Sequence, residues 1–144
     1  MSDGERLIAA ARAAAKNAYA PYSGFSVGAA LLMSDGSVIG GANFENASYG
    51  LSLCAETVAA ATASAAGRLS DVVAVGIVGG MTGKDGIDPV LPCGRCRQVL
   101  NEAAQLGQRD LVVYCSGLTG GPVEEYRLSD LLPHAFGPAS LGMV

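Results

Sequence analysis

Apolar residues recur at helical spacing at the start of the chain, and runs of strand-favouring residues follow. A Ser-x-x-Glu capping box at residues 2–5 and the apolar positions after it predict a helix that ends near Tyr19. Residues 25–33 and 37–44 favour strands, and a turn-forming Ser-Asp-Gly segment at 34–36 separates them. The pattern therefore predicts one helix followed by a β-hairpin.

The rest of the chain alternates helix-favouring segments with short apolar runs. The Ala-rich residues 53–66 predict a second helix, and a third is expected to begin after Pro92 and to run to about Leu106; a Gly follows each. The apolar runs at 72–78 and 111–115 are typical of buried strands. The remaining segments are expected to form a Gly-rich loop over residues 79–91, an edge strand over 123–128 and a short helical turn over 129–132.

The order of these elements, α-β-β-α-β-α-β-β, predicts the fold class. We expect an α/β protein in which a mixed five-stranded sheet lies between helices, a three-layer α/β/α sandwich with right-handed crossovers. A chain of 144 residues suits one domain, and no internal repeat or linker divides it. Residues 1–144 are therefore expected to form a single domain.

Amino-acid composition and net charge indicate which kinds of binding partner are expected. Half of the residues are apolar and 15% are charged, which favours a packed globular protein with some apolar surface covered by self-association. The net charge of -4 opposes a polyanion, so a small neutral substrate is expected rather than a nucleic acid. Neither a signal-peptide pattern nor an apolar run of about 18 residues is present, so we expect a cytoplasmic protein without a membrane partner.

Four cysteines are the candidate metal ligands, because disulfides are rare in the cytoplasm. Cys93 and Cys96 lie three residues apart at the start of the third helix, so both can face one point. Cys54 lies at the start of the second helix, and the positive end of a helix lowers the pKa of a thiol. Cys115 lies in a predicted buried strand, where a free cysteine usually acts as a small hydrophobe. Three ligands would leave a zinc position for water, whereas a fourth would make the site structural.

Glu56 is the candidate acid-base residue beside this metal. It follows Cys54 by two positions within a segment of small and apolar side chains. A carboxylate in the first turn of a helix is also favourable for dipole reasons alone, and positions two apart do not share a helix face. The residues by themselves therefore leave its contact with a metal-bound water open.

Several linked motifs resemble those of a known family. Cys54-Ala55-Glu56 and, later, Pro92-Cys93-Gly94-Arg95-Cys96 resemble the zinc deaminase signature, with Cys as the first ligand. The further motifs are Ala20-Pro21-Tyr22-Ser23, the segment from Asn43 to Gly50, Leu131-Leu132-Pro133 and Phe136-Gly137-Pro138. Together they resemble the small cytidine deaminases, in order and with similar spacing, from about residue 18 to the tail.

The resemblance implies a cytidine-deaminase-like fold and a zinc-dependent hydrolase of pyrimidine salvage. The enzyme would convert cytidine, 2'-deoxycytidine or both to the uridine product and ammonia, as a homotetramer with active sites shared between subunits. It also implies that Cys54, Cys93 and Cys96 bind Zn²⁺ and that Glu56 shuttles protons. The implied substrate contacts are Phe25, which packs on the ligand, Asn43 and Glu45, which bind the sugar hydroxyls, the backbone N–H of Ala55, which binds the base carbonyl, and Phe136, which reaches a neighbouring subunit's site.

One position departs from the family pattern. Many members with three cysteine ligands have Arg directly after the glutamate, where this chain has Thr57. Zinc with three thiolates carries a formal charge of -1, which makes its water harder to deprotonate. We hypothesise that the two helix N-termini compensate, with the Thr57 hydroxyl and Arg97 donating hydrogen bonds to the sulfurs.

Other functions stay open at this point. One is a deaminase of a related aminopyrimidine nucleoside of the blasticidin type. Another is a non-catalytic zinc module in which Cys115 or another group occupies the fourth ligand position. The net negative charge of the chain disfavours an RNA- or DNA-editing deaminase. His134, the only histidine, lies in the tail and is expected to be exposed rather than a ligand.

Overall fold

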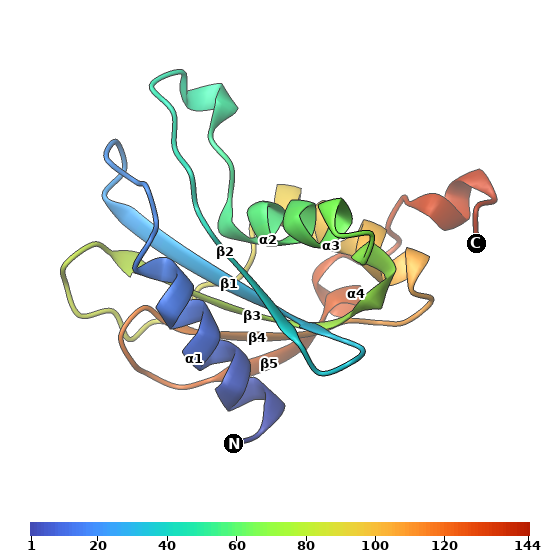
Figure 1. Cartoon of the computed structure of the whole chain (residues 1–144), viewed down its shortest axis with the longest axis horizontal. Coiled ribbons are helices and arrows are strands. Elements are labelled where there is room, and N and C mark those ends of the chain that lie inside the picture. Colours follow the sequence, from blue (N-terminus) through green and yellow to red (C-terminus); the bar gives the residue numbers. More distant parts are fainter.

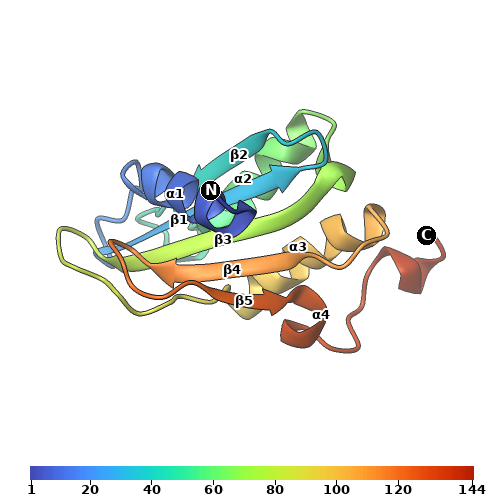
Figure 2. The same ribbon diagram turned by 90° about the horizontal axis from the view of Figure 1, so that it is seen from below.

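Five strands form one mixed sheet in the computed structural model, which describes all residues from 1 to 144 (Figures 1 and 2). The strands are β1 (Phe25–Met33), β2 (Val38–Ala42), β3 (Val72–Met81), β4 (Val112–Gly117) and β5 (Glu124–Arg127). They are ordered β2-β1-β3-β4-β5, with β3 and β4 parallel and the other neighbours antiparallel. The predicted mixed five-stranded sheet is confirmed.

Helices cover both faces of the sheet. The helix α1 (Asp3–Ala15) lies on one face, and α2 (Ala55–Ala65) and α3 (Gly94–Leu106) lie on the other (Figures 1 and 2). The shorter helical segments are α4 (Leu128–Leu131) and the 3-10 turns Tyr49–Leu51, Leu69–Asp71 and Pro138–Leu141. The predicted three-layer arrangement is therefore confirmed. None of the helices has the length and apolar character that crossing a membrane requires.

The sequence of β1 is almost continuously apolar because both faces of this strand are covered. Ala29 and Leu31 belong to the core packed against α2 and α3, whereas Ala30 and Leu32 belong to the core under α1. Successive side chains of a strand point to opposite faces, so a central strand covered on both faces needs apolar residues at every position. The strand β1 is therefore an inner strand, paired with β2 and β3 and covered by helices on both faces.

A glycine in β2 lets α2 approach the sheet closely. A Cβ atom at Gly41 would lie 2.6 Å from the backbone nitrogen of Ala59 and 2.7 Å from the carbonyl oxygen of Ala55. These atoms are backbone atoms of α2, so no change of side-chain rotamer could relieve the contact. The absence of a side chain at Gly41 therefore sets the distance between α2 and the sheet.

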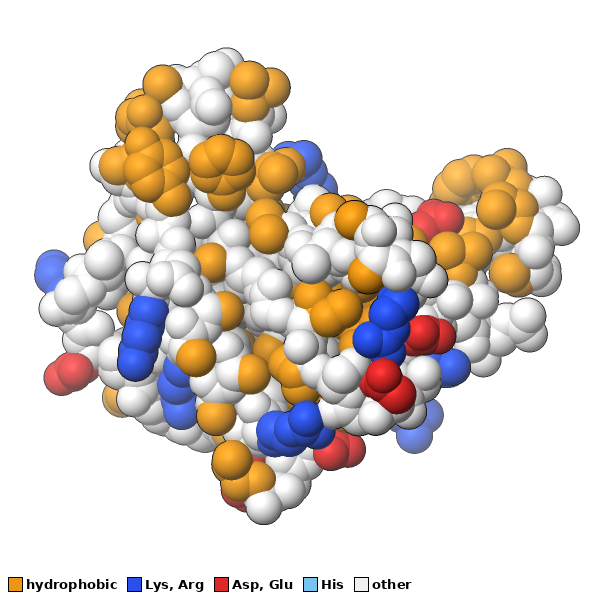
Figure 3. All heavy atoms as spheres, viewed as in Figure 1, with side chains coloured by type: hydrophobic (Ala, Val, Ile, Leu, Met, Phe, Trp, Pro, Cys, Tyr) orange, Lys and Arg blue, Asp and Glu red, His pale blue; other side chains and the backbone are white.

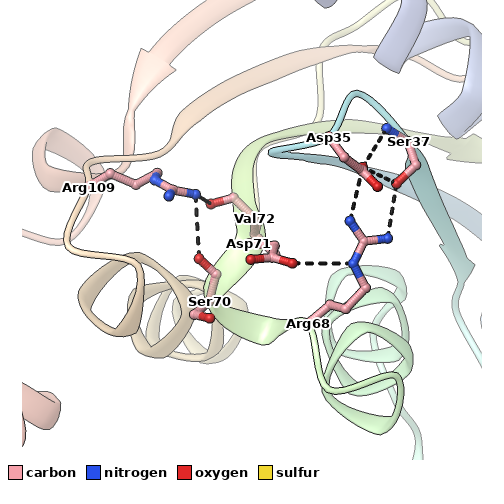
Figure 4. Close-up of polar contacts among 7 residues, drawn as sticks. All are labelled: Asp35, Ser37, Arg68, Ser70, Asp71, Val72 and Arg109. Atoms are coloured by element: carbon pink, nitrogen blue, oxygen red, sulfur yellow. Dashed lines mark hydrogen bonds and ion pairs between the residues drawn. The ribbon is translucent and has the colours of Figure 1, made fainter.

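An arginine network fixes the other end of α2 (Figure 4). Arg68 pairs with Asp35 at 2.9 Å and with Asp71 at 3.3 Å, and it donates to the Ser37 hydroxyl. Hydrogen bonds from Ser37 and then from Arg68 hold the pKa of Asp35 well below its usual range. Arg109 donates to the backbone carbonyls on either side of Asp71. The network joins the β1–β2 turn, the end of α2 and the start of β3.

Two boundaries differ from the sequence prediction by more than two residues. The first helix ends at Ala15 rather than near Tyr19, because Tyr19 forms a bridge with Phe44 and so leaves the helix. The strand β3 runs to Met81 through part of the expected loop, because residues 79 and 80 pair with residues 27 and 26 of β1. In both places, pairing with a distant segment overrides the local residue preference.

Candidate active site

Three cysteines meet at the N-termini of α2 and α3. Cys54 is the N-cap residue of α2, Cys93 is the N-cap residue of α3, and Cys96 lies in the first turn of α3. Their sulfur atoms all lie within 4.8 Å of one another, and the Cys54 and Cys93 sulfurs are 3.9 Å apart. A tetrahedral zinc with Zn–S bonds of about 2.3 Å separates its sulfurs by about 3.8 Å. The three cysteines therefore form a candidate metal site whose donor atoms and spacing fit zinc.

Three cysteine sulfurs this close together can all be thiolates only if a cation lies between them. Burial raises the pKa of Cys54 and Cys96, and the negative charge of nearby Glu56 raises them further. Neither Cys54 nor Cys93 uses its side chain to cap its helix, so both sulfurs are free to bind a metal. The positive ends of two helices favour the thiolate forms. Three neighbouring thiolates are stable together only when a cation offsets their repulsion.

A cavity of about 230 Å³ opens beside two of these sulfurs. Its walls combine apolar side chains with a few polar groups, as small-molecule sites usually do. The residues that line it are Val27, Asn43, Glu45, Ser52, Leu53, Cys54, Ala55, Glu56, Val90, Leu91 and Cys93. The structure thus brings two of the three predicted zinc ligands, Glu56 and three of the five predicted substrate-contact residues to one cavity.

Glu56 lies in this cavity although a helical register would separate it from Cys54. The Cys54 backbone is extended, with φ -74° and ψ 153°, so helix spacing applies only from Ala55 onward. Glu56 is 4% exposed, and burial raises the pKa of its carboxyl group. Burial disfavours the charged form because few waters can solvate it. A carboxyl group with a raised pKa is suited to accepting and returning a proton near neutral pH.

Asn43 joins the cavity wall to the first strand. Its side-chain oxygen accepts a hydrogen bond from the Val27 N–H at 2.9 Å, and its side-chain nitrogen donates to the Phe25 carbonyl at 2.8 Å. The amide therefore continues the ladder between β2 and β1 and is held rigidly. One N–H of the amide remains for a ligand.

Glu45 is held by the loop before β1. Its carboxylate accepts hydrogen bonds from the Tyr22 N–H, the Ser23 N–H and the Ser23 hydroxyl. The Ser23 hydroxyl bond is the main reason that the pKa of Glu45 is lowered. Ser23 is a functional residue that the sequence motifs do not single out, because it lies 22 positions before Glu45 and no local pattern indicates the contact.

The two predicted aromatic contacts lie outside the cavity lining. Phe25 is half-buried at the start of β1, close to Gly79. Phe136 is 64% exposed, and its carbonyl accepts hydrogen bonds from Gln98 and Asn101 of α3. A single chain therefore does not bring Phe136 to the cavity.

The hypothesis about the sulfur environment is supported for Thr57 and wrong for Arg97. The Thr57 hydroxyl lies 3.4 Å from the Cys96 sulfur. Arg97 donates instead to the carbonyl oxygens of Pro92, at 2.8 Å, and Leu131, at 2.9 Å. Through these two hydrogen bonds the guanidinium joins the segment before α3 to the end of α4. Arg97 therefore supports the helix that carries the cysteines without contacting a sulfur.

The remaining candidates lie apart from the cluster. Cys115 is fully buried in β4 and belongs to the apolar core packed against α2 and α3. Burial raises its pKa to about 12, so it stays a neutral thiol, as expected for a small hydrophobe. His134 is exposed in the tail, as expected.

The fold and the site together define an α/β protein of the zinc deaminase class, in which two helix N-termini bring three cysteines and a buried glutamate together. The chain belongs to the family described as the cytidine and deoxycytidylate deaminase zinc-binding region, which matches residues 1–115. This membership confirms the resemblance seen in the sequence motifs.

Proteins of similar sequence and structure support this family membership. The chain is 52% identical to a cytidine deaminase of Halalkalibacterium halodurans, over 93% of this chain and 94% of that protein. A crystal structure of cytidine deaminase from Burkholderia pseudomallei matches with a TM-score of 0.80 and 46% identity, covering 94% of this chain and all of that one. The crystal structure from Mycobacterium tuberculosis matches with a TM-score of 0.73 and 40% identity, covering 95% and 99%.

Proposed function

We propose that the protein is a zinc-dependent hydrolase that deaminates cytidine, 2'-deoxycytidine or both, releasing the uridine product and ammonia. The observation that carries the proposal is the three-sulfur cluster with Glu56 beside it in one cavity. The relatives named cytidine deaminase, at up to 52% identity over most of their length, support the same reaction.

The proposed zinc ligands are Cys54, Cys93 and Cys96. Three ligands leave the fourth position of a tetrahedral zinc for water or substrate. When bound, zinc supplies Lewis-acid chemistry, which lowers the pKa of water and stabilises negative charge on oxygen. Thr57, through its contact with Cys96, would offset part of the thiolate charge.

Glu56 would carry the protons of the reaction. Its buried carboxylate would accept a proton from the attacking water as the new C4–O bond forms. It would then deliver that proton to N3 of the base, which relieves the negative charge that attack places on the ring. Glu56 would next take the remaining proton from the C4 hydroxyl and pass it to the amine, so that the C4–N bond breaks, the C4 carbonyl forms and ammonia leaves.

The remaining cavity residues would orient the nucleoside. Ala55 is the first residue of α2, and its N–H has no partner within the helix, so it can bind the base carbonyl. Asn43 and Glu45 would bind the sugar hydroxyls, with Phe25 packing near the ligand. Because free cytosine would leave these polar groups unpaired, the site should reject it strongly.

Ammonia release by the purified protein tests this function. We expect turnover of cytidine or deoxycytidine, loss of turnover after treatment with a chelator and recovery when zinc is restored. Free cytosine should be a poor substrate. Turnover of a blasticidin-type nucleoside alone would replace the proposed substrate, and no turnover by zinc-loaded protein with any aminopyrimidine would favour a non-catalytic zinc module.

We also propose that the chain acts as a cytoplasmic homotetramer with shared sites. The support is apolar surface: Figure 3 shows hydrophobic side chains gathered on the segment between β2 and α2 and on the C-terminal tail. The most exposed of these include Tyr49, Leu51 and Phe136, at 72%, 66% and 64%. Surfaces of this kind usually mark an interface.

A mixed-subunit experiment tests the sharing. Phe136→Ala subunits lack the side chain offered to the neighbour, whereas Glu56→Gln subunits lack the proton carrier of their own site. Mixed oligomers should therefore regain activity above either parent, because some sites combine intact halves. Mixing without any gain would argue that each subunit is complete.

A further inference from the structure

The loop before β1 is closed by its own hydrogen bonds. The Gly24 N–H donates to the Ala20 carbonyl at 2.9 Å, and Gly24 has a φ of +68°, in the left-handed region that side chains disfavour. The next amide, that of Phe25, donates to the Ser23 hydroxyl oxygen at 3.0 Å. The position of Ser23 is therefore set by the turn around it.

The same hydroxyl binds the carboxylate of Glu45. Ser23 donates its hydroxyl proton to Oε2 at 2.5 Å, and its backbone N–H donates to Oε1 at 3.1 Å. The Tyr22 N–H donates to Oε1 as well, at 3.0 Å. Both oxygens of the carboxylate are therefore restrained; Oε1 accepts two hydrogen bonds, and Oε2, which accepts one, keeps acceptor capacity for a further donor. Ser23 thus connects Glu45 with the first residue of β1 through one oxygen atom.

Glu45 lies at the junction of two hollows. It lines the cavity beside the cysteines and also an adjoining hollow of about 250 Å³, formed with Tyr22, Ser23, Tyr49 and Ser52. A partly exposed Glu side chain without partners would sample several rotamers, and fixing it would cost conformational entropy. Because Ser23 holds the carboxylate in advance, a ligand that binds it is spared that cost.

We propose that Ser23 is a positioning residue, which fixes the Glu45 carboxylate for the sugar hydroxyls and so sets the selectivity for a nucleoside over a free base. This inference rests on the proposed function, in which Glu45 binds the sugar. Ser23 acts through Glu45 and does not touch the reacting atoms. Its loss should weaken substrate binding and leave the chemical step intact.

Steady-state kinetics of Ser23→Ala test the proposal. We expect the KM for cytidine to rise about 10-fold, the scale of one hydrogen bond to a charged group, with kcat changed by less than about twofold. Zinc content should be unchanged. Ser23→Thr keeps the hydroxyl and should restore most of the affinity. Ser48→Ala is the matched control, because Ser48 is an exposed serine nearby whose hydroxyl makes no hydrogen bond.

A double variant separates positioning from a direct effect. In a Glu45→Ala background, Ser23→Ala should raise the KM by less than about twofold, because the carboxylate that it positions is gone. A further rise of about 10-fold would show that Ser23 acts independently of Glu45 and would overturn the proposal. A KM unchanged by Ser23→Ala in the wild-type background would overturn it as well.

A second measurement keeps this inference separate from the proposed function. Carbon-13 NMR of the Glu45 carboxyl group, in zinc-loaded protein without substrate, should show a pKa below the usual range in the wild type. The pKa should return toward the usual range in Ser23→Ala and stay low in Ser48→Ala. Absence of cytidine turnover with this NMR result would refute the proposed function alone, whereas an unmoved pKa in Ser23→Ala would refute the contact itself.

Discussion

Adding one methyl group at Gly41 should displace the helix that carries Cys54 and Glu56. The Cβ atom of Gly41→Ala would lie 2.6 Å from the nitrogen of Ala59 and 2.7 Å from the carbonyl oxygen of Ala55. The closer contact is about 0.8 Å short of the roughly 3.4 Å at which a Cβ ordinarily touches its neighbours. Because both partners are backbone atoms, α2 must move away from the sheet.

This substitution should lower both the stability of the protein and its turnover. Overpacking of a core costs about 1–3 kcal/mol in the free energy of unfolding. For a chain of this length, that cost corresponds to a fall in Tm of roughly 3–10 °C. A misplacement of about 1 Å in an active site can lower the rate about 100-fold, so kcat should fall about 10- to 100-fold.

Thermal unfolding measures the expected fall in Tm, and ammonia release measures the expected fall in kcat, both with zinc present. Gly40→Ala is the matched control in the same strand, because its Cβ would meet Ala14 at an ordinary distance of 3.6 Å. We expect the control to stay close to the wild type in both assays. A Gly41→Ala protein with unchanged Tm and kcat would refute the view that this glycine sets the position of α2.

Three further predictions concern the metal and the proton carrier. Glu56→Gln should keep the fold and zinc content while turnover falls at least about 100-fold, and near-normal turnover would contradict its role. Thr57→Ala should lower zinc affinity about 10-fold and Thr57→Ser should not, as measured by chelator competition; equal affinities would remove Thr57 from the sulfur environment. Zinc affinity should also fall at least about tenfold for each pH unit below 8, because burial raises the pKa of Cys54 and Cys96 and these thiols must lose protons to bind. A pH-independent affinity would contradict the thiolate ligands.

The sequence predicted the fold where local pattern and tertiary packing agree. The run at 25–33 is apolar because both faces of β1 are covered, and this pattern is visible without a structure. The end of the first helix was not visible, because Ala18 continues the helical apolar spacing, whereas in the structure the helix ends at Ala15 and Tyr19 pairs with Phe44. Residues 79 and 80 were expected in a loop because both are glycine, yet their pairing with β1 makes them a strand.

The residues of the site could be predicted from the sequence, whereas their arrangement in space could not. The cysteine spacing pointed to a cluster, and the structure brings Cys54, Cys93 and Cys96 together. Helix spacing left Glu56 uncertain, because the extended backbone of an N-cap residue cannot be seen in the sequence. The contact between Ser23 and Glu45 joins segments 22 residues apart, so no local pattern announces it.

X-ray absorption at the zinc edge of the active, zinc-loaded protein distinguishes a zinc that is open to water from one that is closed by protein ligands. We expect three sulfur ligands at about 2.3 Å and one light-atom ligand that exchanges with solvent. A Cys115→Ser protein should give the same spectrum, because Cys115 is buried in β4 outside the cluster. Four sulfur ligands, or a spectrum that changes with Cys115→Ser, would contradict a zinc site open to water.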